Sequence, residues 1–233
     1  MENKKNFDPV QISSILQDFQ PREIIHPLFK LSAILIPLIF KGDSYSLLLT
    51  SRSSKLRTHK GEMSFPGGRF DPEKDKTLQD TALRETQEEI GIKPENVKII
   101  GRLDDFPTIT GYVIRPFIGI LLKPIRSQLK INIDEVENVI EVPISHFLQP
   151  SIFKETQVDH GYSQFGVLSV FFEDPMIKRG FNIWGATAHI ISAYIKSVHN
   201  IRVTSENYRR PTLNELAEFI NTQKGHKKAE IKK

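Results

Sequence analysis

A long irregular stretch at residues 51–76 constrains the fold of this chain more than any other feature of the sequence. It is rich in glycine, proline, serine and charged residues, and it is far too long to serve only as a connection. Two strand-like runs precede it, at residues 31–40 and 46–50, with a hairpin-like turn between them. A helix follows at about residues 77–90 and is closed by Gly91. The sequence therefore predicts a large loop between a β-hairpin and a helix.

The remaining apolar runs continue this mixture of strands and helices. Strands are expected at four places, residues 97–106, 113–122, 139–142 and 165–172. Helices are expected at residues 8–20, 185–198 and 212–222, with a turn or short helix at 144–148. Elements in this order indicate a mixed sheet with helices packed on it, of the α/β or α+β class.

Length and composition indicate one large domain with short additions at both ends. The chain has 233 residues, of which 39% are hydrophobic, enough to bury a core without a metal or a disulfide. We expect a helical extension at residues 1–30, the main domain at 31–200, and a helix with a partly disordered lysine-rich tail at 201–233. The absence of cysteine excludes disulfide scaffolds, iron–sulfur sites and thiol nucleophiles. The chain shows neither a secretory signal nor eighteen consecutive apolar residues, so we expect a cytoplasmic protein without a membrane span.

The positive charge of the chain is concentrated at one end. The formal net charge is +4 at pH 7. Residues 224–233 hold five lysines and one glutamate, and the rest of the chain has equal numbers of basic and acidic residues. A lysine run of this kind is typical of a solvated tail, so we expect no specific nucleic-acid partner.

Three glutamates crowd one edge of the helix expected at residues 77–90. At about 100° per residue, Glu85, Glu88 and Glu89 fall within about one third of the helix circumference, beside the arc that faces the core. Like charges at this spacing repel one another, so they require a partner. The sequence allows two partners: Arg84 beside a solvated acidic face, or a hard divalent cation such as Mg²⁺, which prefers oxygen ligands.

The sequence around this helix follows a known pattern. The glycine pair Gly67 and Gly68 ends the segment SFPGG at residues 64–68, and residues 84–91 read RETQEEIG. A paired glycine lets the backbone approach a ligand closely or make a tight turn. Together these features resemble the Nudix box. The resemblance implies a hydrolase of nucleoside diphosphates linked to another moiety, on an α/β/α sandwich with a mixed sheet and a loop–helix–loop catalytic motif.

The loop of this chain is longer than the loop of the usual Nudix box. Fifteen residues separate Gly68 from Arg84, two more than in the family pattern. Counting from Gly68, the position of the first glutamate of the box falls on Lys74, between Glu73 and Asp75. Which acid takes the place of that glutamate stays open at this point.

A second segment resembles one subfamily. Residues 48–68 read LLTSRSSKLRTHKGEMSFPGG and resemble the motif that precedes the box in coenzyme A diphosphatases, with weaker similarity over residues 31–195. Its arginines suit a substrate with several phosphates, because a guanidinium group binds phosphate through two hydrogen bonds. The expected substrate-binding residues are Arg52, Arg57, His59, Gly67, Gly68 and Arg69. We expect Trp184 to be a core residue rather than a platform for a nucleobase.

The resemblance implies a metal-dependent reaction, the hydrolysis of coenzyme A and its thioesters to adenosine 3′,5′-bisphosphate and (acyl-)4′-phosphopantetheine. The expected ligands of Mg²⁺ or Mn²⁺ are Glu85, Glu88 and Glu89. The expected catalytic residues are Arg84, Glu88, Glu89 and Glu135. The general base stays open among Glu89, Glu135 and Glu137.

Two other functions stay open. One keeps the mechanism and changes the substrate to ADP-ribose, a dinucleotide or another nucleotide sugar, because specificity lies outside the catalytic helix. The other is a non-catalytic module that binds a ligand or nucleic acid. That module predicts a degraded acidic cluster and a basic patch on the folded body, and the sequence shows neither. We therefore expect an enzyme whose partner is a small molecule.

Overall fold

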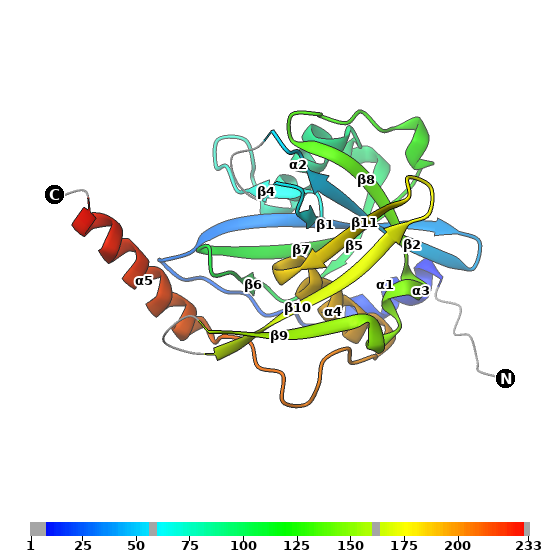
Figure 1. The fold of residues 1–233 in the computed structure, drawn as a ribbon. Coiled ribbons are helices and arrows are strands. Elements are labelled where there is room, and N and C mark those ends of the chain that lie inside the picture. Colours follow the sequence, from blue (N-terminus) through cyan, green and yellow to red (C-terminus); the bar gives the residue numbers. More distant parts are fainter. Residues whose placement is uncertain (1–7, 56–59, 160–163, 231–233) are drawn as a thin grey trace.

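The structure is a computed structural model that describes residues 8–55, 60–159 and 164–230 (Figure 1). The α-helices of these ranges are α1 (Pro9–Asp18), α2 (Leu78–Ile90), α3 (Ile144–Phe147), α4 (Gly185–His199) and α5 (Leu213–Glu230). Short 3-10 helices lie at Pro94–Asn96, Ile125–Ser127 and Pro150–Ile152. The strands are β1 (Lys30–Lys41), β2 (Ser44–Arg52), β3 (Met63–Ser64), β4 (Gly67–Arg69), β5 (Val97–Arg102), β6 (Phe106–Pro107), β7 (Tyr112–Leu121), β8 (Val136–Pro143), β9 (Phe153–Asp159), β10 (Gln164–Asp174) and β11 (Arg179–Trp184).

The larger sheet has eight strands and is mixed, as the sequence predicts. Its main order is β3-β2-β1-β7-β5, and the remaining strands join this path as partners: β4 of β1, β6 of β7 and β8 of β2. β1 and β7 run parallel, and the other pairs are antiparallel. β1 is central and nearly continuously apolar, which is typical of a strand covered on both faces. The predicted hairpin of β1 and β2 is confirmed, and its turn contains Gly42 with φ of 60°.

The two faces of this sheet are covered differently. On one face, Ala82 of α2 packs with Leu35 of β1 and Phe117 of β7. On the other face lies the main core, to which α4 contributes Tyr194, α1 contributes Ile12, and the smaller sheet contributes further apolar side chains. Figure 1 shows α2 and the smaller sheet on opposite sides of the long strands β1 and β7. The predicted sandwich is therefore confirmed, with an additional sheet on one side.

The smaller sheet has the strand order β11-β10-β9 and is antiparallel. The sequence prediction contains only β10 of these three strands. β9 reads FKETQVD and is exposed at most of its positions, so it has no apolar run that would indicate a strand. The chain also forms two short strands, β3 and β4, inside the predicted loop at 51–76.

Three further predictions need correction. The strand predicted at residues 97–106 is divided into β5 and β6, because Asp104 and Asp105 leave the ladder and accept hydrogen bonds from the backbone N–H groups of Arg22 and Ile24. The last helix continues to Glu230, eight residues past its predicted end at residue 222. Trp184 is 45% exposed. It faces outward because alternate residues of β11 point to opposite faces, and its neighbour Ile183 points inward.

The two terminal segments pack on the main domain through different clusters. Ile12 and Leu16 of α1 are buried in the main core. Leu216 and Ile220 of α5 pack in a separate cluster with Phe29, beside the start of β1. Within the described ranges, no helix combines the length and the apolar character needed to cross a membrane.

Candidate active site

Helix α2 is fixed at both ends by its own capping residues. Thr77 Oγ1 accepts a hydrogen bond from the Asp80 N–H at 3.2 Å, and Asp80 Oδ2 accepts one from the Thr77 N–H at 2.8 Å. This capping box satisfies two free donors at the start of the helix. At the other end, Gly91 has φ of 79°, and its N–H donates to the Gln87 carbonyl. The helix therefore begins and ends where the sequence predicts.

The packing of α2 sets the direction of its acidic side chains. Thr81, Ala82, Thr86 and Ile90 are buried. Glu85 is half-buried, Glu88 is exposed and Glu89 is buried. The predicted acidic edge beside the core-facing arc is confirmed. It reaches further inward than a solvated face does, because Glu89 is only 6% exposed.

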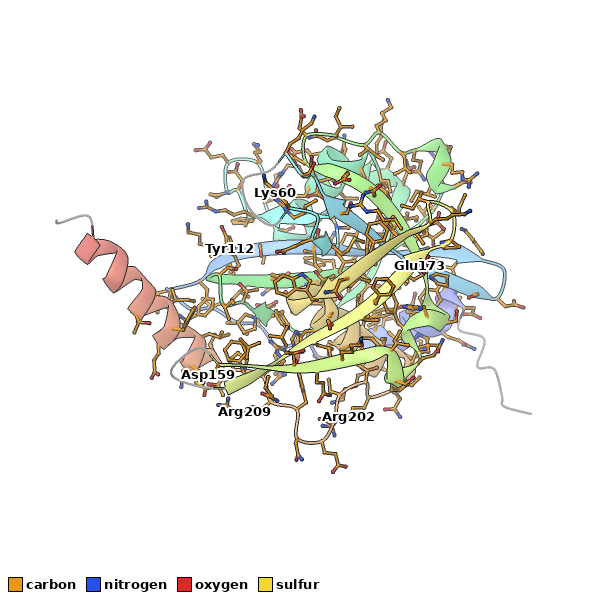
Figure 2. The ribbon with its side chains drawn as sticks, viewed as in Figure 1. Lys60, Tyr112, Asp159, Glu173, Arg202 and Arg209 are labelled. Atoms are coloured by element: carbon orange, nitrogen blue, oxygen red, sulfur yellow. The ribbon has the colours of Figure 1, made fainter. Side chains whose placement is uncertain are left out.

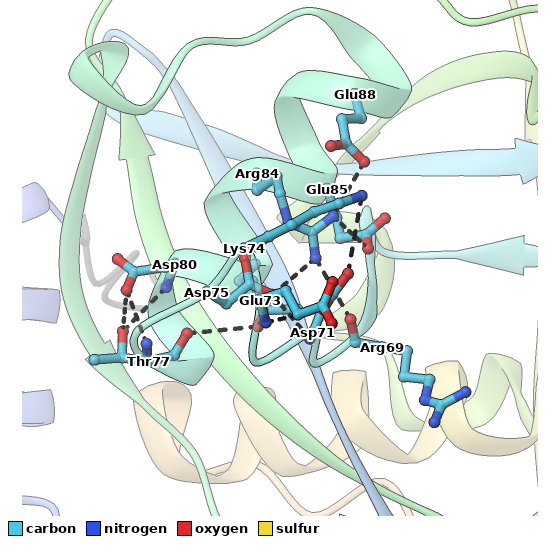
Figure 3. A network of polar contacts seen from close by, with 12 residues as sticks. Arg69, Asp71, Glu73, Lys74, Asp75, Thr77, Asp80, Arg84, Glu85 and Glu88 are labelled. Atoms are coloured by element: carbon cyan, nitrogen blue, oxygen red, sulfur yellow. Dashed lines mark hydrogen bonds and ion pairs between the residues drawn. The ribbon is translucent and has the colours of Figure 1, made fainter.

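Arg84 is held by a buried carboxylate of the long loop, Asp75 (Figure 3). Arg84 Nε donates to Asp75 Oδ1 at 2.7 Å, and Arg84 Nη2 donates to Oδ2 at 2.8 Å. Thr81 Oγ1 and the Asp71 N–H also donate to Oδ2. Asp75 is 4% exposed, and the hydrogen bonds from Arg84 lower its pKa to about 2 despite its burial. Its neighbour Glu73 is exposed, so Asp75 is the acid of this loop that reaches Arg84.

Arg84 also neutralises two glutamates of its own helix. Its Nη1 lies 2.8 Å from Glu85 Oε1 and 3.0 Å from Glu88 Oε2. One guanidinium group therefore balances the repulsion within the acidic edge and connects it to Asp75. Burial raises the pKa of Glu85, whereas the hydrogen bond from Arg84 opposes that shift.

Glu89 differs from the other acids of the helix. Its Oε2 is buried and has no hydrogen-bond partner among the described residues. Burial raises the pKa of Glu89 to about 8, and the negative charges of Glu85 and Glu135 add to the shift. Arg52 and the Gly67 N–H oppose it. Glu89 is therefore a buried acid close to two other acids, and part of its carboxylate is unsatisfied.

The glycine pair brings the loop against the helix and the sheet. Gly67 and Gly68 form β4, which pairs with β1. A Cβ atom on Gly67 would lie 2.4 Å from the Ala33 carbonyl oxygen, and one on Gly68 would lie 2.4 Å from Cδ of Glu85. Only glycine leaves this space, because real Cβ contacts are longer. The pair therefore serves close packing, and Gly68 makes room for the Glu85 carboxylate.

Comparison with known proteins agrees with this loop–helix arrangement. Residues 30–155 match the model of the NUDIX domain. An uncharacterized Nudix hydrolase, NudL, of Photorhabdus laumondii is 37% identical over 167 residues, covering 72% of this chain and 84% of that protein. The chain belongs to the Nudix hydrolase family. Its enzyme class follows: Nudix hydrolases act on nucleoside diphosphate derivatives and generally use divalent metals such as Mg²⁺ or Mn²⁺.

Two further relatives complete the comparison. The peroxisomal coenzyme A diphosphatase NUDT7 of Mus musculus is 33% identical over 159 residues, covering 68% of this Nudix hydrolase and 66% of the mouse protein. A solved structure of a C. elegans Ap4A hydrolase binary complex is similar with a TM-score of 0.41 and 21% identity. That similarity covers 51% of this chain and 83% of the other.

The acidic edge of this Nudix hydrolase fits a divalent cation. Among the described residues, no three acidic or histidine side chains are already gathered as a metal site, and Glu85 and Glu88 are paired with Arg84. Glu89 Oε2, in contrast, is buried and unpartnered. Burying an anionic oxygen without a partner is unfavourable, and Mg²⁺ prefers carboxylate oxygens. The donor set therefore suits the metals that the family uses.

Glu135 lies directly before β8, and Glu137 is the second residue of this strand. The two acids differ in their surroundings. Glu135 raises the pKa of both Glu85 and Glu89, so its charge lies close to the acidic edge. Glu137 is paired with Arg179 at 2.8 Å. Of these two candidates for the general base, Glu135 is therefore the one near Glu89.

Two of the predicted substrate-binding cations, Arg52 and Arg69, lie within the described residues. Arg52 is half-buried, and its Nε is buried without a hydrogen-bond partner among the described residues. Arg69 is exposed, and its side chain points away from the network around Arg84 (Figure 3). Arg57 and His59 lie outside the described residues. The structure thus brings Arg52 next to Glu89 and leaves Arg69 at the surface.

The pairing of Asp75 with Arg84 does not follow from the sequence. Eight residues lie between the two, and this part of the chain is partly loop, so no helical period relates them. The sequence signal that points to Asp75 is the Nudix box, which has an acid in this part of the loop. Asp75 is the acid nearest the expected position that also lies close enough to the helix start to be buried.

Proposed function

We propose that this Nudix hydrolase cleaves the diphosphate of coenzyme A and its thioesters. The products are adenosine 3′,5′-bisphosphate and 4′-phosphopantetheine or its acyl form. Two similarities support this substrate: the motif at residues 48–68, and the mouse relative named as a coenzyme A diphosphatase.

The observation that carries the mechanism is the buried, unpartnered Oε2 of Glu89. Water does not solvate the ionised carboxylate at this position, so a bound cation would favour its charged form and supply the missing partner. Glu85, Glu88 and Glu89 would hold Mg²⁺ or Mn²⁺. When bound, the metal neutralises charge on the diphosphate and lowers the pKa of the attacking water.

The residues around Glu89 have three further roles: phosphate binding, proton transfer and positioning. Arg52 places a cation beside the acidic edge. There it binds a phosphate oxygen and stabilises the negative charge that develops in the transition state. Glu135 accepts the proton of the attacking water, because its carboxylate is close to Glu89 and is exposed. Arg84 is a positioning residue, since it fixes Glu85 and Glu88 and is itself fixed by Asp75.

A small substrate panel tests the proposal. Purified protein with Mg²⁺ or Mn²⁺ is incubated with coenzyme A, acetyl-coenzyme A, ADP-ribose and Ap4A, and the products are identified by mass spectrometry. We expect the two coenzyme A compounds to give the highest kcat/KM and adenosine 3′,5′-bisphosphate as a product. E89Q protein, prepared in the same way, controls for contaminating hydrolases. Intact coenzyme A together with rapid cleavage of ADP-ribose or Ap4A would contradict the substrate and leave the family activity in place.

A further inference from the structure

Arg210, like Arg52, is half-buried without a carboxylate partner among the described residues. Arg210, in the connection between α4 and α5, makes no ion pair with the described residues. Its guanidinium carbon instead lies 3.8 Å from the centre of the Phe106 ring. Burial lowers its pKa to about 10. A cation removed from water without a counter-charge destabilises the fold, so its position needs a reason other than stability.

Two acids that directly precede Phe106 in the chain, Asp104 and Asp105, are already paired. Asp105 accepts two hydrogen bonds from Arg115, at 2.8 and 2.9 Å. Asp104 is paired with Arg22 at 2.7 Å, and Arg22 itself repels Arg210. Neither acid is therefore paired with Arg210.

The side chains packed around Arg210 are neutral and polar or aromatic. The rings of Phe106 and His189 lie 5.6 Å apart, and those of His189 and Tyr208 lie 5.7 Å apart. His189 contacts the Gly185 carbonyl and the Tyr208 hydroxyl. Burial and Arg210 lower the pKa of His189 to about 4, so it is neutral near pH 7. The cluster of Phe106, His189, Tyr208 and Arg210 thus has one charge, on the guanidinium group.

The sheet places this cluster at a defined distance from the glycine strand. Phe106, Ile114, Ser32 and Arg69 are successive partners across β6, β7, β1 and β4. Three strand spacings separate Phe106 from Arg69, which is roughly 14 Å. This spacing between two backbone positions exceeds the distance between two phosphates of one diphosphate and lies within the length of a coenzyme A thioester. His189, Tyr208 and Arg210 also lie outside residues 30–155, the part matched by the family model.

We propose that Arg210 recognises an anionic group of the substrate that is remote from the scissile diphosphate. A desolvated guanidinium group pairs with an oxyanion through two hydrogen bonds, and its binding partner supplies the missing counter-charge. In a coenzyme A compound, two groups have this chemistry: the 3′-phosphate and a carboxylate at the end of an acyl group. The inference rests on the proposed function, because it concerns the substrate of the same site.

Four substrates and three variants test this inference. Coenzyme A is compared with dephospho-coenzyme A, which lacks the 3′-phosphate, and malonyl-coenzyme A is compared with acetyl-coenzyme A. In the wild type, the compound with the recognised anion has the higher kcat/KM. R210Q is expected to reduce that advantage at least tenfold through KM, and to change the partner compound less than twofold. R210K, which keeps the charge and loses the planar fork, is expected to retain part of the advantage.

Arg202 supplies a matched control on the same connection (Figure 2). It is exposed and donates to the Ser205 carbonyl at 2.8 Å, so R202Q should leave all four kcat/KM values unchanged. Thermal unfolding checks that each variant is folded. Equal losses on both members of each pair in R210Q, or no loss on any, would overturn the inference and leave the proposed function intact. Failure of the wild type to cleave any of the four compounds would overturn both.

Discussion

Asp75, in the loop before α2, and Glu89, in the last turn of α2, are two buried carboxylates whose pKa values are shifted in opposite directions. Asp75 is 4% exposed and Glu89 is 6% exposed. Arg84 lowers the pKa of Asp75 to about 2, whereas burial raises the pKa of Glu89 to about 8. The two side chains are similarly inaccessible to water, but hydrogen bonds hold the charge of Asp75, whereas Glu89 lies deeper and desolvation favours its neutral form.

The difference separates a structural acid from a functional one. Four donated hydrogen bonds satisfy Asp75, so its charge stabilises the loop and leaves no oxygen for a ligand. Glu89 has a buried oxygen without a partner, which is unfavourable until a cation arrives. Acids with strongly raised pKa values are concentrated at functional sites for this reason.

Replacement of Glu89 should have the largest effect. E89Q keeps the shape of the side chain and removes its charge, so we expect turnover of a diphosphate substrate to fall about 10³-fold. The metal-free protein should be at least as stable as the wild type, because glutamine is neutral without having to retain a proton in this buried position. Stabilisation by Mg²⁺ or Mn²⁺ should decrease, since a ligand stabilises only by binding the folded state. Near-normal turnover, measured by steady-state kinetics, would contradict the metal site.

Replacement of Asp75 should chiefly affect stability. D75N leaves Arg84 without its buried counter-charge, and we expect the free energy of unfolding to fall by about 3 kcal/mol. Turnover should fall about tenfold, through the displacement of Glu85. D71N is the control, because Asp71 is half-exposed and lies 3.9 Å from Lys74, a pair that contributes only a few tenths of a kcal/mol. Equal urea midpoints for D75N and D71N would show that the buried pair does not hold the loop.

The pH dependence of stability should distinguish the two acids directly. The pKa of Glu89 is raised from 4.5 to about 8, so its effect is absent below pH 4.5. Between pH 4.5 and 8 the unfolded chain releases this proton and the fold retains it, so the stability of the metal-free fold decreases as the pH rises. The difference in unfolding free energy between E89Q and the wild type should grow by about 1.4 kcal/mol per pH unit in this window.

Asp75 should show the opposite sign. Its pKa is lowered from 3.8 to about 2, so its stabilisation is present above pH 3.8 and disappears as the pH falls through 2. The difference between the wild type and D75N should be constant from pH 5 to 8. Urea unfolding of the metal-free proteins across this range measures both effects, and a flat difference for E89Q would contradict the raised pKa of Glu89.

Gly68 leaves space for the Glu85 carboxylate, so its replacement tests whether the position of Glu85 matters for turnover. A Cβ atom at position 68 would lie 2.4 Å from Cδ of Glu85, so G68A must move this carboxylate. The Glu85 carboxylate ends a flexible side chain, so it can move at a small cost in stability. We expect turnover to fall several-fold as Glu85 leaves Arg84. Unchanged turnover in G68A would show that the position of Glu85 is not restrictive.

Glu137 should have the smallest effect. E137Q removes an exposed pair with Arg179, so stability should change by a few tenths of a kcal/mol and turnover should not change. E135Q, the matched variant beside the acidic edge, should lower kcat about tenfold or more if Glu135 is the general base. A larger loss of kcat in E137Q than in E135Q would reverse this assignment.

Much of the fold follows from local sequence signals. The capping box at Thr77 and the glycine at position 91 determine the limits of α2, and the apolar run of β1 determines a strand covered on both faces. β9 and the outward direction of Trp184 do not follow, because exposed strands lack an apolar run and a single tryptophan does not reveal its face.

The sequence alone determined that three glutamates share one edge of a helix. The helical period fixes the angle between residues that are one to four positions apart. Only the tertiary structure decided what each acid does. Desolvation and hydrogen bonding depend on groups brought from far along the chain: Asp75 to Arg84, and Arg52 and Glu135 to Glu89. Arg210 does not stand out in the sequence for the same reason. Its burial and its lack of a carboxylate partner depend on the side chains that surround it in the fold.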